Sequence, residues 1–261
     1  MSKEWALVTG ASGGLGEALA REIASRGLNV ALAARGDAAM QALASELRDR
    51  HKVETRVFSI DLSAPGSAAA LTERIDTDGI KPDLLLNNAA FGMAGSFVDA
   101  DHARLLAMLQ LDVVTLTELT LLYGRRMMAR GRGRILLVGS LASFSPCPNL
   151  AAYAAAKAYV LSLGEALNVE FAPAVGVTTL SPGLMDTGFN TASGFKTPAG
   201  LQRTILPVEK VARIGVDALL AGKSSVVAGK INKLTAFSNR LLSRHFVAKL
   251  STRAEAAEHG S

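Results

Sequence analysis

The sequence predicts a single-domain α/β protein, with helices on both faces of a doubly wound parallel sheet and therefore three layers. Short aliphatic runs alternate with longer segments rich in alanine, leucine and charge. Because these runs are apolar throughout, they fit strands buried on both faces of a parallel sheet. The 261 residues, 49% of them hydrophobic and 20% charged, suit about one large domain with a sizeable core.

The elements follow one another in a regular order. The aliphatic runs predict strands at residues 6–9, 28–33, 53–60, 84–86, 135–138 and 177–180. Between them, helical patterns cover residues 15–26, 38–50, 68–76, 102–130 and 151–171. Pro173 ends the last of these helices. Each helix connects two strands, as parallel pairing requires.

The alternation stops after the sixth strand. Residues 183–207 are rich in Gly, Thr, Ser and Pro, and they are too many for an ordinary connection. We expect this segment to be a substrate-binding loop. The predicted organisation is one dinucleotide-binding and catalytic domain over residues 1–222, followed by a basic, partly amphipathic extension over residues 223–261.

The net charge of +5 is concentrated near the C-terminus. Residues 218–254 contain seven Lys or Arg and no Asp or Glu, whereas residues 1–217 are balanced. A nucleic-acid-binding protein would carry its basic surface on the body of the domain, so we expect no nucleic-acid partner.

From residue 230 an apolar set recurs at helical spacing beside a basic stripe. The apolar set is Leu234, Phe237, Leu241 and Leu242, and the basic stripe is Lys233, Arg240 and Arg244. This pattern fits a helix at a membrane surface, a docking face for a partner subunit, or a terminal helix packed on its own domain.

The sequence disfavours a disulfide, a metal site, and secretion or insertion into a membrane. Cys147 is the one cysteine, and the four histidines lack the spacing of metal ligands, so we expect neither a disulfide nor a metal site. The first ten residues do not follow the order of a secretion signal, and no uninterrupted apolar run is long enough to span a bilayer. The expected location is cytoplasmic, with peripheral membrane contact through the C-terminal region as an option.

A glycine-rich turn follows the first strand and opens the first helix. Its residues are Gly10, Ser12, Gly13, Gly14, Leu15 and Gly16. Glycines allow a tight turn and close approach of a pyrophosphate, which the helix N-terminus attracts, so this Rossmann-like arrangement predicts dinucleotide binding. The same residues contain G-x-S-x-G, the nucleophile elbow of α/β-hydrolases. Only nine residues precede it, too few for the earlier strands that an elbow needs.

Two residues on the following strands bear on which dinucleotide binds. Arg35 ends the second strand, where an acidic residue would bind the ribose 2′-hydroxyl of NAD. A guanidinium suits a 2′-phosphate, so NADP(H) is favoured over NAD(H), although Arg35 could equally be a solvated surface charge. Asp61, at the end of the third strand, could accept a hydrogen bond from the adenine amino group or simply cap a turn.

A third group of residues has the chemistry for acid–base catalysis. Ser140 ends the fifth strand, and Tyr153 and Lys157 lie four residues apart on one face of a predicted helix. An ammonium near a phenol favours the phenolate and lowers the pKa of Tyr153, while Ser140 can hold a substrate oxygen. In so alanine-rich a helix, Tyr153 and Lys157 could also be a packing aromatic and a solvated lysine.

Together these segments resemble the short-chain dehydrogenase/reductase family over residues 7–187. The matching motifs, in chain order, are TGxxxGxG at residues 9–16, NNAG at residues 87–90, the serine at Ser140, YxxxK at Tyr153 and Lys157, and PGxxxT at residues 182–187. The thirteen-residue gap from Ser140 to Tyr153 is also typical of the family.

The resemblance implies a role for each matching residue. Tyr153 would exchange the proton, Lys157 would bind the nicotinamide ribose, and Ser140 would orient the carbonyl. Asn88, Ala89 and Ala90 would line the adenosine ribose, and Pro182, Gly183 and Thr187 would contact the nicotinamide half. Asp61 and Leu62, after the third strand, are further candidates for cofactor binding. The family also suggests a homodimer or homotetramer built on the helices that contain Asp112 and Tyr153.

The sequence departs from the family pattern at two positions. Asp112 stands where the family has a catalytic asparagine whose main-chain carbonyl holds a water near the lysine. A carboxylate there could pair with Lys157 or have a raised pKa, which would change turnover or its pH dependence. Ala90 replaces the last glycine of NNAG and would crowd the cofactor slightly.

Apolar residues in several loops point to the substrate. Residues 141–149 join Ser140 to the Tyr153 helix and should line the pocket. The candidate lining residues are Phe91, Met93, Phe144, Cys147, Phe189 and Phe195, which could equally be core. The favoured function is NADP(H)-dependent interconversion of an apolar ketone or aldehyde with its alcohol. The alternative is a catalytically impaired NADPH-binding module that acts through its basic C-terminal helix.

Overall fold

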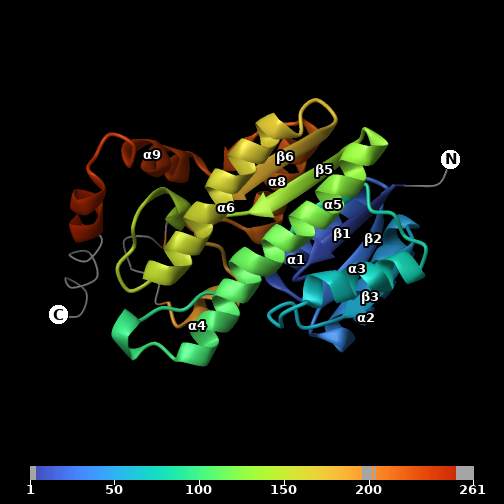
Figure 1. The fold of residues 1–261 in the computed structure, drawn as a ribbon, viewed down its shortest axis with the longest axis horizontal. Helices are drawn as coiled ribbons and strands as arrows, with labels where there is room; N and C mark the ends of the chain where they lie inside the picture. The colour runs from blue at the N-terminus through green and yellow to red at the C-terminus, as the bar shows by residue number, and fades with distance from the viewer. Residues whose placement is uncertain (1–3, 196–201, 203, 251–261) are drawn as a thin grey trace.

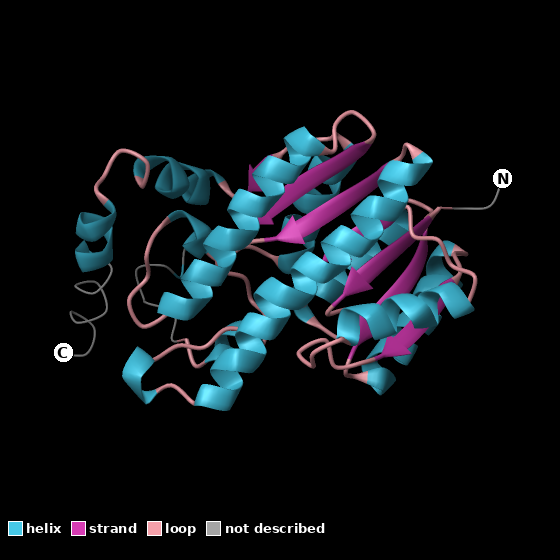
Figure 2. Cartoon of the chain, viewed as in Figure 1, coloured by secondary structure: helices cyan, strands magenta, loops and turns pink. Residues whose placement is uncertain are grey.

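A computed structural model describes residues 4–195, 202 and 204–250 (Figure 1). Seven parallel strands form one sheet in the order β3-β2-β1-β4-β5-β6-β7. Helices lie on both faces of the sheet, which confirms the predicted three-layer α/β fold (Figure 2). The strand order reverses between β1 and β4, and ligands of such sheets bind outside the carboxyl ends of the strands at that point.

The strands are close to those expected from the aliphatic runs, with one addition. Their bounds are β1 Trp5–Thr9, β2 Asn29–Ala34, β3 Thr55–Ser59, β4 Leu84–Asn87, β5 Gly133–Val138, β6 Val175–Ser181 and β7 Ser225–Val227. Leu7 packs into the core on one face of the sheet and Val8 into the core on the other. This double burial explains why the strands are apolar at every position.

The helices divide between the two faces of the sheet. Their bounds are α1 Gly14–Ser25, α2 Asp37–His51, α3 Ser67–Thr77, η1 Phe97–Asp99, α4 His102–Leu109, η2 Gln110–Thr115, α5 Leu116–Arg130, η3 Leu141–Phe144, α6 Ala151–Glu170, α7 Phe189–Ser193, α8 Val208–Leu220 and α9 Lys230–Ser238. Buried side chains of α1, α2 and α8 share one core, and those of α3, α5 and α6 share the other.

The predicted helix over residues 102–130 needs a correction. It is helical throughout, but a π-helical segment, η2, separates α4 from α5 and contains Asp112. By length and composition alone His102–Arg130 could cross a membrane. Leu116, Leu119 and Tyr123 of α5 are buried in the core on one face of the sheet.

The predicted domain boundary after residue 222 also needs a correction. β7 follows that position and pairs with β6, so it is the seventh strand of the same sheet. Asn232 of α9 is buried, and a side chain at Gly183 would collide with it. The chain therefore remains part of the domain through α9. After α9 a turn leads to a further helical segment over residues 244–250.

Candidate active site

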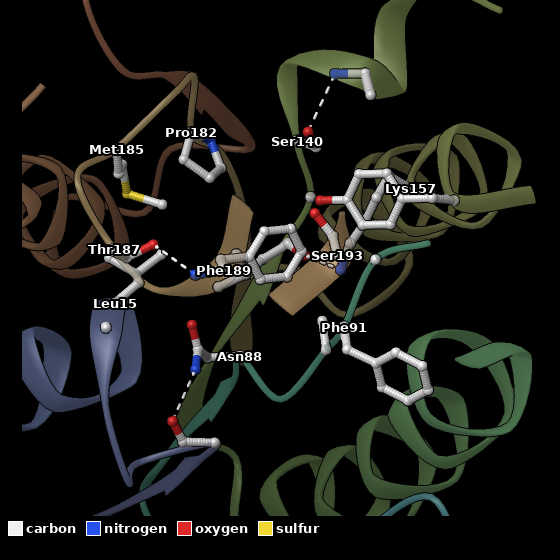
Figure 3. Close-up of a pocket in the computed structure, with 18 of the residues that line it drawn as sticks. Leu15, Asn88, Phe91, Ser140, Lys157, Pro182, Met185, Thr187, Phe189 and Ser193 are labelled. Atoms are coloured by element: carbon white, nitrogen blue, oxygen red, sulfur yellow. Dashed lines mark hydrogen bonds between the residues drawn. The ribbon is translucent and has the colours of Figure 1, made fainter. Parts of the chain in front are cut away.

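A cavity of about 790 Å³ opens at the carboxyl ends of the strands, where the strand order reverses. All the residues predicted to bind the cofactor line it. They are Gly10, Ser12, Gly13, Gly14, Leu15, Gly16, Arg35, Asp61, Leu62, Asn88, Ala89, Ala90, Tyr153, Lys157, Pro182, Gly183 and Thr187. Figure 3 shows part of this lining, including Leu15, Asn88 and Thr187.

The glycine turn is shaped by close backbone packing. Gly10 has a φ of 67°, and a Cβ there would lie 2.8 Å from Asn88 Nδ2. Asn88 Nδ2 donates a hydrogen bond of 2.9 Å to the carbonyl of Thr9, which fixes β4 against the turn. A Cβ at Gly13 would meet open space, and no side chain caps the start of α1. The first N–H groups of α1 can therefore bind a phosphate in the cavity.

Arg35 lies beside the turn in surroundings that suit an anion. It is exposed, lines the cavity, and forms no ion pair with any residue that the structure describes. Gly36, the residue after Arg35, lies against Ser12, since a Cβ on Gly36 would be 3.1 Å from Ser12 Cβ. Ser12 therefore lies against the backbone next to Arg35, and both residues line the cavity.

Asp61 is held in a local turn. Its Oδ1 accepts hydrogen bonds from Ser63 Oγ at 2.7 Å and from the Ser63 N–H at 3.0 Å. These bonds, and more weakly the charge of Arg35, lower the pKa of the Asp61 carboxyl. Asp61 therefore caps its turn while it lines the cavity.

Ser140 and Lys157 are connected through Ser143. The Ser143 hydroxyl accepts a hydrogen bond of 3.1 Å from the Ser140 N–H and donates one of 2.8 Å to the Lys157 carbonyl. Ser140 Oγ accepts from the Ala142 N–H at 3.1 Å, as the N-cap of η3 (Figure 3). Ser143 belongs to none of the motifs in the sequence. Its position three residues after Ser140, the predicted catalytic serine, as in a capping box, was the available signal.

Lys157 and Asp112 form an ion pair inside the protein. Lys157 Nζ lies 3.2 Å from Asp112 Oδ2, and the two side chains are 2% and 0% exposed. Lys157 Nζ also donates a hydrogen bond of 3.2 Å to the carbonyl of Val138, and the Phe91 N–H donates one of 3.2 Å to Asp112 Oδ1. Asp112 does not line the cavity, and its ion pair with Lys157 connects it to the cavity wall.

Tyr153 completes the group on the cavity wall. Its ring centroid lies 5.7 Å from Lys157 Nζ and 5.8 Å from that of Phe189. The predicted lowering of the Tyr153 pKa is not the net result. Burial raises the pKa of the phenol, and the lowering by Lys157 is opposed by the Asp112 carboxylate. The sequence indicated the effect of the lysine but could not reveal the burial or the counter-ion.

The other two members of the group are also shifted. Burial raises the pKa of the Asp112 carboxyl, although the attraction of Lys157 opposes this. Burial lowers the pKa of the Lys157 ammonium, but Asp112 and Tyr153 together raise it above the ordinary lysine value. Each charge of the pair therefore depends on the other.

The apolar wall of the cavity is close to that expected from the loops. Phe91, Cys147, Phe189 and Phe195 line it. Met93 and Phe144 do not, because only some side chains of the short helix η3 and of each loop face the cavity. Lining residues that sequence analysis missed include Leu184, Met185, Ile231, Thr235 and Asn239. Three of these lie on or just after α9, which no motif connects with the glycine turn.

The short helix α7 covers the Tyr153 side of the cavity and is tied to the loop after β4. The Ala94 N–H donates a hydrogen bond of 2.8 Å to the carbonyl of Ser193. Arg104 Nη2 of α4 donates one of 2.7 Å to the carbonyl of Ala192. α7 lies in the predicted substrate-binding segment, of which residues 196–201 and 203 lie outside the described residues.

Comparison with known proteins identifies the family of this site. A profile of the short chain dehydrogenase family matches residues 4–196. The chain belongs to the short chain dehydrogenases. A relative of this family, the 7beta-hydroxysteroid dehydrogenase of Collinsella aerofaciens, is 32% identical over 238 residues, which are 88% of each chain. The chain is thus an oxidoreductase of the short chain dehydrogenase family.

Solved short chain dehydrogenases share the fold over most of their length. A 7beta-hydroxysteroid dehydrogenase, studied for its stereoselectivity, superimposes with a TM-score of 0.86 at 28% identity, over 95% of this chain and 96% of the other. An enzyme from Sphingobium yanoikuyae, solved in complex with NADPH, gives 0.81 at 27% identity, over 91% and 93%.

Proposed function

We propose that this short chain dehydrogenase interconverts an apolar, bulky ketone or aldehyde with its alcohol, using NADP(H) in preference to NAD(H). The observation that carries the proposal is the meeting of Ser140, Tyr153 and Lys157 on one wall of the cavity that contains the glycine turn. A dinucleotide site and an acid–base group thus share one space.

The residues present fit a dinucleotide with a 2′-phosphate. The start of α1 offers free N–H groups beside Gly13, where the cavity has room for a diphosphate. At the other end, Arg35 and Ser12 offer a cation and a hydroxyl without an ion-paired carboxylate. When bound, such a cofactor supplies or accepts the hydride of the reaction.

The protein's own residues handle the substrate oxygen and its proton. Ser140 donates a hydrogen bond that orients and polarises the carbonyl. In reduction, the Tyr153 O–H bond breaks and the proton passes to the substrate oxygen, which becomes the alcohol. Lys157, held by Asp112 and the Val138 carbonyl, places its positive charge beside the phenolate that remains.

Steroid-like carbonyl compounds are the substrate class we favour. Phe189, whose ring lies beside that of Tyr153, lines the cavity together with Phe195, Met185 and Ile231, and these apolar side chains suit a rigid apolar body. Relatives along nearly the whole chain are named hydroxysteroid dehydrogenases.

The test measures NADPH oxidation against a panel of bulky apolar ketones, with Tyr153→Phe as the matched variant. Deleting the phenolic oxygen removes the proton donor and should lower kcat by about 100-fold or more, while NADPH binding, measured by fluorescence, stays within about threefold. Full activity in Tyr153→Phe would show that Tyr153 is not the acid.

A second candidate is an NADPH-binding module with impaired catalysis. The ion pair between Asp112 and Lys157 favours it, because the lysine is already engaged by a carboxylate. Tight NADPH binding without turnover on the whole panel would support this alternative over the first.

A further inference from the structure

Lys157 does not act alone in this site, because it is paired with Asp112. Lys157 Nζ lies 3.2 Å from Asp112 Oδ2, and neither side chain is more than 2% exposed. Among the described residues, Asp112 Oδ2 has no hydrogen-bond donor besides this ammonium. The pair as a whole is close to neutral, and with so little solvent its charges are weakly screened.

Tyr153 senses both members of the pair. Burial has the largest effect on the phenol and raises its pKa. Of the pair, the ammonium favours the phenolate and the carboxylate opposes it, so each cancels part of the effect of the other. The remaining groups that face the phenol are the hydroxyl of Ser140, at the end of β5, and the thiol of Cys147, in the following loop. Among the described residues, Asp112 is therefore the carboxylate that acts on the phenol.

We propose that Asp112 is a positioning residue that, by holding Lys157 in a buried ion pair, keeps the Tyr153 phenol protonated and directs this site toward carbonyl reduction. Reduction needs a proton donor, which the phenol supplies, whereas alcohol oxidation needs the phenolate as a base. The inference rests on the proposed function for its consequence, but its physical basis is a property of the cofactor-free protein.

The test is a titration of Tyr153 in the cofactor-free protein, read from tyrosinate absorbance. Subtracting the titration curve of Tyr153→Phe removes the absorbance contributed by Tyr159 and Tyr123. Burial raises the pKa of Tyr123 to about 12. Asp112→Asn removes the carboxylate charge, so the phenolate should form at a pH lower by about one unit or more. Asp217→Asn, in an exposed pair with Arg26, is the matched control and should change nothing.

The same shift should appear in the rates. In the pH–rate profiles of Asp112→Asn, the rise of alcohol oxidation and the fall of ketone reduction should both occur at a lower pH than in the unmodified protein. The difference should equal the shift seen in the titration. A titration unchanged by Asp112→Asn would overturn the inference, since the carboxyl would then carry no charge. Should Asp112→Asn not fold, Asp112→Ser tests the same loss of charge. Because the titration needs no substrate, a failure of the proposed function would leave its outcome intact.

A separate observation concerns the surface of the last described helices. Seven large apolar side chains there are 42% to 74% exposed. They are Ile231, Leu234, Phe237, Leu241, Leu242, Phe246 and Leu250. Asn232, Ala236 and Val247, in the same segments, are buried. We call the seven apolar residues, together with the five cations of residues 230–250, the C-terminal surface.

The charges of the C-terminal surface are of one sign. Its cations are Lys230, Lys233, Arg240, Arg244 and Lys249, and residues 218–254 contain no Asp or Glu. None of these cations forms an ion pair with a described residue. A second copy docking with the same surface would bring like charges together, whereas an anionic surface would complement them.

We infer that the C-terminal surface docks on an anionic lipid bilayer. Its apolar side chains would enter the headgroup boundary, and its long cationic side chains would reach lipid phosphates. Ile231, Thr235 and Asn239 line the cavity, so the docked face would lie beside the substrate entrance. An apolar substrate could then enter from the lipid.

Flotation with vesicles of phosphatidylglycerol and phosphatidylcholine tests this inference. The full chain should bind these vesicles, bind pure phosphatidylcholine at least about tenfold less, and be released by salt. The double variant Leu234→Ser and Phe237→Ser should lose most binding, whereas Val98→Ser, another exposed apolar residue, should not. Equal binding of all three chains, no binding, or a change in subunit number caused by the double variant would each overturn it.

Discussion

At the scale of single residues, Arg35 carries the proposed preference for NADP(H) over NAD(H). It is exposed at the rim of the cavity, and the nearby carboxylate of Asp61 is already occupied by Ser63. A guanidinium in this state has hydrogen bonds to offer a phosphate. The position at the end of the second strand predicted Arg35 from sequence. Its surroundings in the structure indicate that the guanidinium is available to bind a phosphate.

Arg35→Asp should weaken NADPH binding by about 10- to 100-fold, because it replaces charge-assisted hydrogen bonds with repulsion of the 2′-phosphate. NADH binding should change little, since its ribose carries a hydroxyl there. Fluorescence titration with both cofactors measures the two constants. Arg50→Asp, an exposed position on α2 with the same change in charge, is the control. Equal losses for both cofactors would contradict the role of Arg35.

At the scale of elements, η2 decides where Asp112 lies. A π-helical turn changes the register between α4 and α5, and such segments are frequent at functional sites. Asp112 is buried against Lys157 of α6, while Thr115 of the same segment hydrogen-bonds the carbonyl of Leu62 at 2.9 Å. One irregular turn thus contacts both α6 and the loop that follows β3.

The anchoring of α7 gives a prediction at the same scale. Arg104→Ala removes the hydrogen bond to the Ala192 carbonyl and the contact of the guanidinium with the Phe91 ring, whose centroid is 5.8 Å away. With α7 held less firmly, the substrate KM should rise about three- to tenfold, since one such bond is worth about 1 kcal/mol. Steady-state kinetics measure this, and kcat should change less than twofold.

The control for this variant is Arg125→Ala, an exposed arginine of α5. It should leave both kinetic constants unchanged. An unchanged KM in Arg104→Ala, or a loss confined to kcat, would show that the arginine does not position α7 for substrate binding.

At the scale of the whole molecule, the last strand and helix are integral to the domain. β7 pairs with β6, and Ala228, which follows β7, is fully buried in the core shared by α1, α2 and α8. α9 then supplies one wall of the cavity. The sheet and the site are therefore incomplete without residues that follow position 222.

Two truncated chains test this conclusion. A chain ending at residue 239 should keep NADPH binding within about threefold and unfold cooperatively. A chain ending at residue 222 should lose several kcal/mol of stability, because an edge of the sheet and buried apolar area are exposed, and should bind NADPH weakly or not at all. Thermal unfolding and cofactor titration measure both properties. Equal stability of the two chains would show that the domain ends at residue 222, as predicted from the sequence.

The amino-acid sequence by itself determined the α/β class, the strand and helix alternation up to residue 180, and a set of predicted cofactor-binding residues, all of which line the cavity. These depend on local signals, namely apolar runs, a glycine turn at a helix start and a four-residue spacing on one helix. Such patterns can be recognised from the sequence because they are formed by residues close together along the chain.

Only the tertiary structure decided the electrostatics around Tyr153 and the part played by the C-terminal helices. Asp112 and Lys157 are 45 positions apart, and their pairing depends on a π-helical turn and on burial. Ile231 and Thr235 reach the cavity because β7 continues the sheet. Burial and long-range contact reverse the expected shift of a pKa, and neither can be read from spacing along the chain.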